Sequence, residues 1–124
     1  MTRVNVGILP QELPSKLLLA EHREMKRIPN VVASGRCCLE HIPVQFTLGI
    51  GHVRFFYNKL TYLYKRYAAV HNECLLREFN VQDYSYCWHG IPSNLLNDYT
   101  PTESDRQLII DRIKLRGFSL LPLS

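Results

Sequence analysis

Apolar residues recur every three or four positions along the middle of the chain, between Gly51 and Glu78. The recurring residues are Val53, Phe56, Leu60, Leu63, Tyr67, Val70 and Cys74. Side chains at these intervals fall on one face of an α-helix, which is the pattern of a helix packed against a core. We therefore predict one unbroken helix over residues 51–78, which at 1.5 Å per residue would be about 40 Å long and would cross the whole domain.

Two shorter helices are predicted on either side of this segment. Residues 13–28 form the first, with an apolar side made by Leu13, Leu17, Leu18 and Ala20. Pro29 is expected to end it, because a proline inside a helix removes a hydrogen bond and clashes with the preceding turn.

The other helix is predicted over residues 100–116. It opens with Thr100-Pro101-Thr102-Glu103, which has the sequence of a capping box with proline at the first helical position. Gly117 follows as a natural stop.

The connecting segments predict little regular structure. Residues 44–48 favour a short strand, and residues 79–99, rich in Asn, Asp and aromatic residues, favour an irregular loop. Strands and helices do not alternate, so a parallel sheet is not expected. The pattern predicts an all-α fold, a compact single domain over residues 1–124 with three main helices, of which the central one is long.

Composition narrows the class of protein. A length of 124 residues fits one domain, and a hydrophobic fraction of 46% is typical of a globular chain rather than a disordered one. No apolar run approaches the roughly 18 residues of a membrane-spanning helix, and the first residues carry no stretch of signal-peptide length. We expect an intracellular protein, in the cytoplasm or with the DNA in a nucleoid or nucleus, and neither secreted nor membrane-bound.

The formal net charge of +4 favours an anionic partner, foremost DNA or RNA. Arg23 and Arg27 are four residues apart and share a helix face, as do Arg112 and Arg116. Opposite the apolar stripe, the predicted central helix carries Arg54, Lys59, Lys65 and Arg66. We interpret that side either as a solvated face or as part of a DNA-facing surface.

Familiar catalytic motifs are absent from the sequence. There is no Walker loop, dinucleotide fingerprint, His-Glu-x-x-His or zinc-finger pattern. Three cysteines and two histidines outside the apolar stripe do not have the spacing of a common zinc site, so neither a metal nor another cofactor is expected. These residues are Cys37, Cys38, His41, Cys87 and His89. Cys74 belongs to the apolar stripe, and His52 and His71 are assigned structural or surface roles by default.

Thr2 has one chemically suggestive property. Its side chain is small, so removal of Met1 would leave a free α-amine with a pKa near 7.7–8.0. Such an amine is partly neutral at cellular pH and can attack an electrophilic carbon. The residues alone assign no reaction to it, and an ordinary N-terminal threonine is the simpler interpretation.

Several ordered segments nevertheless carry a resemblance. They are MTRVN at residues 1–5, LAEHREMKR at 19–27, FTLGIGHVRFFYNKL at 46–60, ECL at 73–75, FN at 79–80 and DYTP at 98–101. Together they resemble the pyrimidine-dimer DNA glycosylase/AP lyase family of the phage endonuclease V type. The similarity is collinear from residue 1 to about 117, and the family's compact helical fold agrees with the predicted one.

The resemblance implies a mechanism. Thr2 matches the N-terminal threonine whose amine attacks C1′ of the damaged nucleotide, so that the glycosidic bond breaks and a Schiff base forms. Glu24 matches the catalytic carboxylate, which would stabilise positive charge at C1′ and move protons during β-elimination. The strand is then cut 3′ to the abasic sugar.

The resemblance also implies a partner, which is double-stranded DNA containing pyrimidine dimers or abasic sites. Basic residues would hold its phosphates, namely Arg3, Arg23, Arg27, Arg112 and Arg116. The duplex would be kinked, with the base opposite the lesion flipped out. We expect the protein to act as a monomer.

Three features depart from the family pattern. The segment between Arg27 and His52 is several residues shorter, His22 stands where tyrosine is expected, and residues 117–124 lack a Trp/Tyr-rich ending. Two alternatives therefore stay open beside the dimer glycosylase. One is an AP lyase, or a glycosylase for another lesion, and the other is a non-catalytic module that binds damaged DNA.

Overall fold

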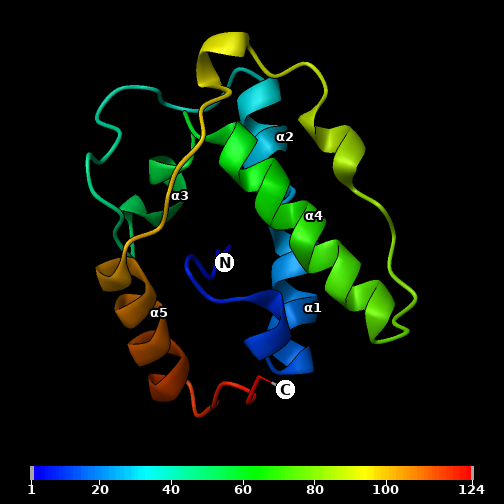
Figure 1. Ribbon diagram of the computed structural model, residues 1–124. Coiled ribbons are helices and arrows are strands. Elements are labelled where there is room, and N and C mark those ends of the chain that lie inside the picture. The colour runs from blue at the N-terminus through cyan, green and yellow to red at the C-terminus, as the bar shows by residue number, and fades with distance from the viewer. Residues whose placement is uncertain (1, 124) are drawn as a thin grey trace.

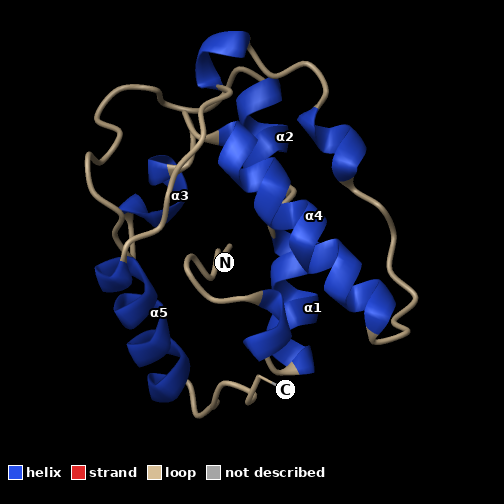
Figure 2. Ribbon diagram, in the orientation of Figure 1, coloured by secondary structure: helices blue, strands red, loops and turns tan. Residues whose placement is uncertain are grey.

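Five α-helices and three short 3-10 helices make up the fold over residues 2–123, the part that the computed structural model describes (Figures 1 and 2). The α-helices are α1 (Ser15–Glu24), α2 (Arg27–Ala33), α3 (Gly51–Phe55), α4 (Leu60–Leu76) and α5 (Glu103–Leu115). These residues contain no strand, which confirms the all-α prediction and makes the strand predicted at residues 44–48 wrong. Within the same part of the chain, no helix is both long and apolar enough to cross a membrane.

The predicted central helix is interrupted, so the prediction of one unbroken helix is wrong. Phe56, Tyr57 and Lys59 donate their N–H groups three residues back, which tightens the end of α3. The Lys59 ammonium donates to the Phe55 carbonyl oxygen at 2.9 Å, which is one of the carbonyls at the end of α3. The turn buries both Phe55 and Phe56 completely, although neighbouring residues of one helix point about 100° apart.

The apolar stripe itself is confirmed across this interruption. Phe56, Leu60, Leu63, Tyr67, Val70 and Cys74 are all buried, and Val53 packs against them. The 17 residues of α4 span about 25 Å at 1.5 Å per residue, and α4 packs against α1 (Figure 1). The core therefore forms where the sequence places it, on a shorter helix than expected.

The first predicted helix is also two helices, because Pro29 acts earlier than expected. Pro29 has no N–H to donate to the carbonyl of Met25, and its ring would clash with that carbonyl in a continuous helix. The Met25 carbonyl accepts instead from Ile28 N–H at 3.2 Å, and the chain bends between α1 and α2. Pro29 then lies in the first turn of α2, where a missing N–H costs nothing.

The last helix, α5, begins later than residue 100. Its cap is Thr102, whose hydroxyl accepts from Asp105 N–H at 3.1 Å while the Asp105 carboxylate accepts from Thr102 N–H at 3.0 Å. The capping box predicted at Thr100 thus forms two residues further on. The stop at Gly117 is confirmed, because this glycine follows the helix with a φ of +82°.

Two 3-10 helices interrupt the segment predicted as an irregular loop. They are η2 (Ser85–Trp88) and η3 (Ser93–Leu95). Trp88 is buried, and its indole N–H donates to the Leu60 carbonyl oxygen at 3.1 Å, at the start of α4. This segment is therefore fixed to the core rather than loosely attached.

Candidate functional site

The N-terminal segment lies in the interior of the fold. Figure 1 shows this end of the chain between α1 and α5. Val4, Val6 and Ile8 are at most 1% exposed, and Thr2 and Arg3 are half-buried. The first described residues are thus held by the core and do not form a free tail.

A pocket of about 320 Å³ opens beside these residues. Its lining combines three distant parts of the sequence, which are the N-terminus, the turn into α3, and α5. The lining residues are Thr2, Arg3, Gly49, His52, Val53 and Arg112. Three of the predicted site residues, Thr2, Arg3 and Arg112, therefore meet in one pocket.

His52 joins α3 to the N-terminal segment. Val4 N–H donates to its Nε2 at 3.0 Å, and its Nδ1 lies 3.0 Å from the Thr47 carbonyl oxygen. The imidazole is only 3% exposed. Burial lowers the pKa of His52 to about 4, an effect that the Thr47 carbonyl opposes and Arg112 reinforces. The ring is consequently neutral at physiological pH.

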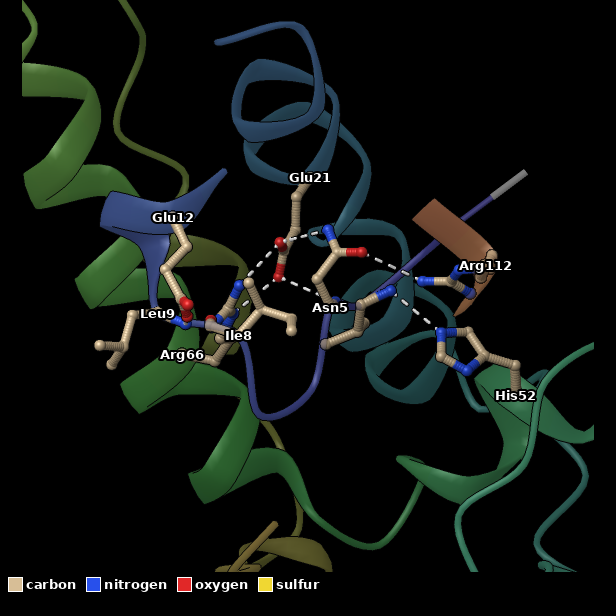
Figure 3. Close-up of polar contacts among 9 residues, drawn as sticks. Asn5, Ile8, Leu9, Glu12, Glu21, His52, Arg66 and Arg112 are labelled. Carbon is tan, nitrogen blue, oxygen red and sulfur yellow. Dashed lines mark hydrogen bonds and ion pairs between the residues drawn. The ribbon is translucent and has the colours of Figure 1, made fainter. Parts of the chain in front are cut away.

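A chain of buried polar contacts holds Arg112 from the other side (Figure 3). Arg112 Nη2 donates to Asn5 Oδ1 at 3.2 Å, and Asn5 Nδ2 donates to Glu21 Oε1 at 2.8 Å. Arg66 completes the chain with two hydrogen bonds to the Glu21 carboxylate, from Nε at 2.8 Å and from Nη2 at 3.0 Å. The Asn5 amide thus bonds to both Glu21 and Arg112 and links their positions.

The placement of Arg66 corrects the sequence analysis. It was expected on a solvated or DNA-facing side of the central helix, yet its side chain is 7% exposed and that of Glu21 is 0% exposed. A buried carboxylate needs a partner, because the cost of removing an unpaired charge from water is large. Arg66 supplies that partner and so is not available to a phosphate.

The cations around the pocket are crowded. Burial, together with Arg3 and Arg116, lowers the pKa of Arg112 to about 10, although Glu21 acts in the opposite direction. Within residues 2–123, Arg112 Nε is buried and has no hydrogen-bond partner. Since Arg66 already neutralises Glu21, the charges of Arg3 and Arg112 leave the pocket net positive, as a site for an anion would be.

Glu24 and Arg116 belong to the same electrostatic neighbourhood. Burial and Arg3 lower the pKa of Arg116, and Glu24 partly offsets them. The Glu24 side chain is 14% exposed, and its Oε2 lies 3.5 Å from Nη2 of the exposed Arg23. The ends of α1 and α5 thus bring a carboxylate and a guanidinium toward the residues of the pocket.

The remaining two basic residues lie apart from this pocket. Arg23 is 61% exposed and borders a different hollow, together with His22 and Tyr84. Arg27 is exposed at the start of α2. Over residues 2–123, neither side chain lines the pocket beside Thr2.

Sequence reasoning missed the residues that position the others. His52 was assigned a default role, and Asn5, Glu21 and Arg66 were not singled out for the site. Asn5, Glu21 and His52 all lie inside the conspicuous segments 1–5, 19–27 and 46–60, which was the signal that could have found them. In the described residues, no three His, Cys, Asp or Glu side chains gather as a metal site would require.

Together these features define an all-helical protein that encloses its own N-terminal segment in a basic pocket. A comparison with known protein families matches residues 1–85 to the family described as pyrimidine dimer DNA glycosylase. This match covers more than half of the 124 residues, and the chain belongs to that family. The family is one of DNA glycosylases, so its substrate is DNA.

The matched residues include only part of the candidate site. It contains Thr2, Arg3, Arg23, Glu24 and Arg27, whereas α5 lies beyond its end. Arg112 is nonetheless folded into the pocket of Thr2 and Arg3. The segment outside the matched residues therefore contributes directly to the candidate site.

Proposed function

We propose that this protein is a bifunctional enzyme that excises pyrimidine dimers by N-glycosylase action and nicks the strand by AP-lyase β-elimination. The reaction runs through a Schiff base on the α-amine of Thr2. The observation that carries the proposal is the shared pocket of Thr2, Arg3 and Arg112. Removal of Met1, which lies outside the described residues, is a condition of this chemistry.

The covalent steps follow from the properties of an amine. The neutral amine attacks C1′, the C1′–N bond to the enzyme forms, and the glycosidic bond breaks as the damaged base leaves. One amine proton goes to the departing base and the other to the ring oxygen as the C1′–O4′ bond breaks, which gives the imine. Removal of a C2′ proton then expels the 3′ phosphate, which cuts the strand.

Glu24 is proposed as the group that manages charge and protons in these steps. A carboxylate stabilises the positive charge that develops at C1′, and it can accept the C2′ proton. Its contact with Arg23 at 3.5 Å is long for a strong ion pair, so its oxygens are not saturated by that partner.

The arginines have two proposed tasks. Arg3, Arg112 and Arg116 place positive charge beside the amine, and neighbouring cations favour the neutral, nucleophilic form of an amine. All five predicted arginines also bind phosphates of the DNA, with Arg23 and Arg27 reaching the backbone from the exposed side of α1 and α2.

Reductive trapping tests the proposal. Purified protein, shown by mass spectrometry to lack Met1, is incubated with dimer-containing, abasic and undamaged duplexes and then treated with borohydride. We expect a covalent adduct on the dimer and abasic duplexes and none on undamaged DNA. No adduct on either damaged duplex would reject the covalent mechanism.

A register variant provides the matched control. One alanine inserted between Met1 and Thr2 moves the terminal amine along the chain by roughly 3.3–3.6 Å without changing any side chain of the pocket. This variant should still bind abasic DNA but should form the adduct far more slowly. Equal trapping by both proteins would assign the adduct to another amine.

A second candidate is an enzyme of the same chemistry that acts on abasic sites alone. The C-terminal segment favours it, because Leu121 N–H donates to the Glu12 carbonyl oxygen at 2.7 Å, and Phe118 and Leu120 pack against the core. Those residues are thus engaged within the protein. An adduct on abasic DNA without one on dimer DNA would establish this candidate.

A further inference from the structure

The imidazole of His52 is fixed in one chemical state by its two partners. The Val4 N–H is a donor, so Nε2 must carry a lone pair, and the Thr47 carbonyl is an acceptor, so Nδ1 must carry the proton. The opposite tautomer and the imidazolium would both present an N–H to the Val4 N–H. Only the neutral Nδ1–H form satisfies both contacts.

The ring is also held in place by its packing. Phe46 and Phe56 meet it edge-on, each with a ring-centroid distance of 5.4 Å. The charged groups that act on it are Arg112, Arg3 and Glu21, and burial is the largest influence on its pKa. The protein therefore keeps a buried, rigid hydrogen-bond acceptor at the wall of the pocket.

The His52 acceptor binds the chain close to the Thr2 amine, the proposed nucleophile. Val4 is two residues after Thr2, a separation of roughly 7 Å at most along an extended chain. Val4 also accepts locally from Val6 N–H, so among residues 2–123 the Val4–His52 contact is the long-range hydrogen bond nearest in sequence to Thr2. His52 itself lines the same pocket as Thr2.

We propose that His52 is a positioning residue, which holds the N-terminal segment by the Val4 amide so that the Thr2 amine stays directed into the pocket. This role rests on the proposed function. It assigns no proton transfer to His52, because both ring nitrogens are occupied by the protein. Gly49 and Val53 line the same pocket as His52 and Thr2.

Two substitutions separate positioning from simple packing. His52→Phe keeps an aromatic ring against Phe46 and Phe56 but removes the acceptor, and His52→Gln retains one acceptor and one donor. With abasic duplex at saturation, the rate of borohydride-trappable adduct should fall about 10- to 100-fold in His52→Phe, the range expected for a displacement near 1 Å. His52→Gln should recover much of that rate, and the Kd for the duplex should stay nearly constant in both variants.

His71→Phe is the matched control, because it makes the same substitution at a half-buried histidine of α4 that does not line this pocket. It should leave the adduct rate near that of the wild type. An equal rate in folded His52→Phe and wild type would overturn the positioning role. If the wild type forms no adduct on any duplex, the proposed function fails instead.

Nuclear magnetic resonance tests the contact without any reaction. Long-range ¹H–¹⁵N spectra of the wild type should show Nδ1 protonated and Nε2 unprotonated, and the Val4 amide should exchange slowly with solvent. These spectra decide the matter if His52→Phe does not fold. An Nε2-protonated ring, or a Val4 amide that exchanges as fast as an unprotected one, would overturn the proposal.

Discussion

Two glutamates three residues apart in α1 occupy opposite environments. Glu21 is completely buried, and its oxygens are saturated by Arg66 and Asn5. Glu24 keeps some exposure and has one long contact with an exposed arginine. Because the Glu21 oxygens are already occupied by protein donors, Glu24 is the better candidate for contact with the substrate, and Glu21 has a structural role.

Replacement of Glu24 tests the first half of that division. Glu24→Gln should bind abasic DNA about as tightly as the wild type but lose about 10²- to 10⁴-fold in strand cutting, the usual contribution of a general acid or base. Single-turnover cutting and a binding titration measure the two effects. Glu40→Gln, at an exposed position, is the control. Weaker binding with full cutting would contradict the role of Glu24.

Replacement of Arg66 tests the second half. Arg66→Met leaves the buried Glu21 carboxylate without its ion pair and should lower the free energy of unfolding by about 3–5 kcal/mol. Lys65→Met, next to it on α4, breaks the Lys65–Asp98 pair, whose side chains are 64% and 53% exposed. That control should change the free energy of unfolding little, because solvent screens an exposed pair. Urea titrations that give equal losses would show that burial of the pair matters little.

At the scale of whole elements, the sequence predicted faces better than ends. The intervals in the apolar stripe place the core-facing side of α4 correctly, although the charge of Arg66 hid its burial. They are blind to the turn at residues 56–59, since Phe56 and Leu60 stay buried on both sides of it. The sequence also did not predict the bend before α2, because Pro29 disrupts the hydrogen bond to the carbonyl four residues before it.

The cap of α5 offers a direct test of one such shift. Thr102→Ala removes the hydroxyl that accepts from Asp105 N–H and should lower the free energy of unfolding by about 1 kcal/mol. Thr100→Ala, at the position that the sequence favoured, lies outside the helix and should change stability little. Thermal unfolding of both variants compares them. A larger loss of unfolding free energy in Thr100→Ala than in Thr102→Ala would show that the helix begins at residue 100.

At the scale of the whole molecule, the candidate site is a product of tertiary structure. Only a resemblance placed Thr2, Arg3 and Arg112 in one site, because no spacing relates residue 2 to residue 112. His52 and Asn5 could not be assigned their contacts from the sequence, because each contact depends on a partner in another segment. Local patterns predict elements, whereas the pocket requires their assembly.

Two buried histidines also tie the stability of the whole fold to pH. His22 and His52 are 2% and 3% exposed. Burial lowers the pKa of each to about 4, with His71 and Lys26 adding to the effect at His22 and the Thr47 carbonyl opposing it at His52. In the unfolded chain both regain a pKa near 6.5. Between pH 6.5 and 4 the unfolded state therefore binds more protons, and the free energy of unfolding falls as pH falls.

The decline should be on the order of 3 kcal/mol per histidine between pH 7 and pH 4. Urea titrations at half-unit pH steps measure it, and most of the loss should occur above pH 4.5. His22→Gln should flatten the slope in that window, whereas His89→Gln, at an exposed histidine, should not. A wild-type stability that stays constant from pH 6.5 to 4.5 would mean that these rings become protonated without leaving the fold, and the neutral state assigned to His52 would have to be given up with it.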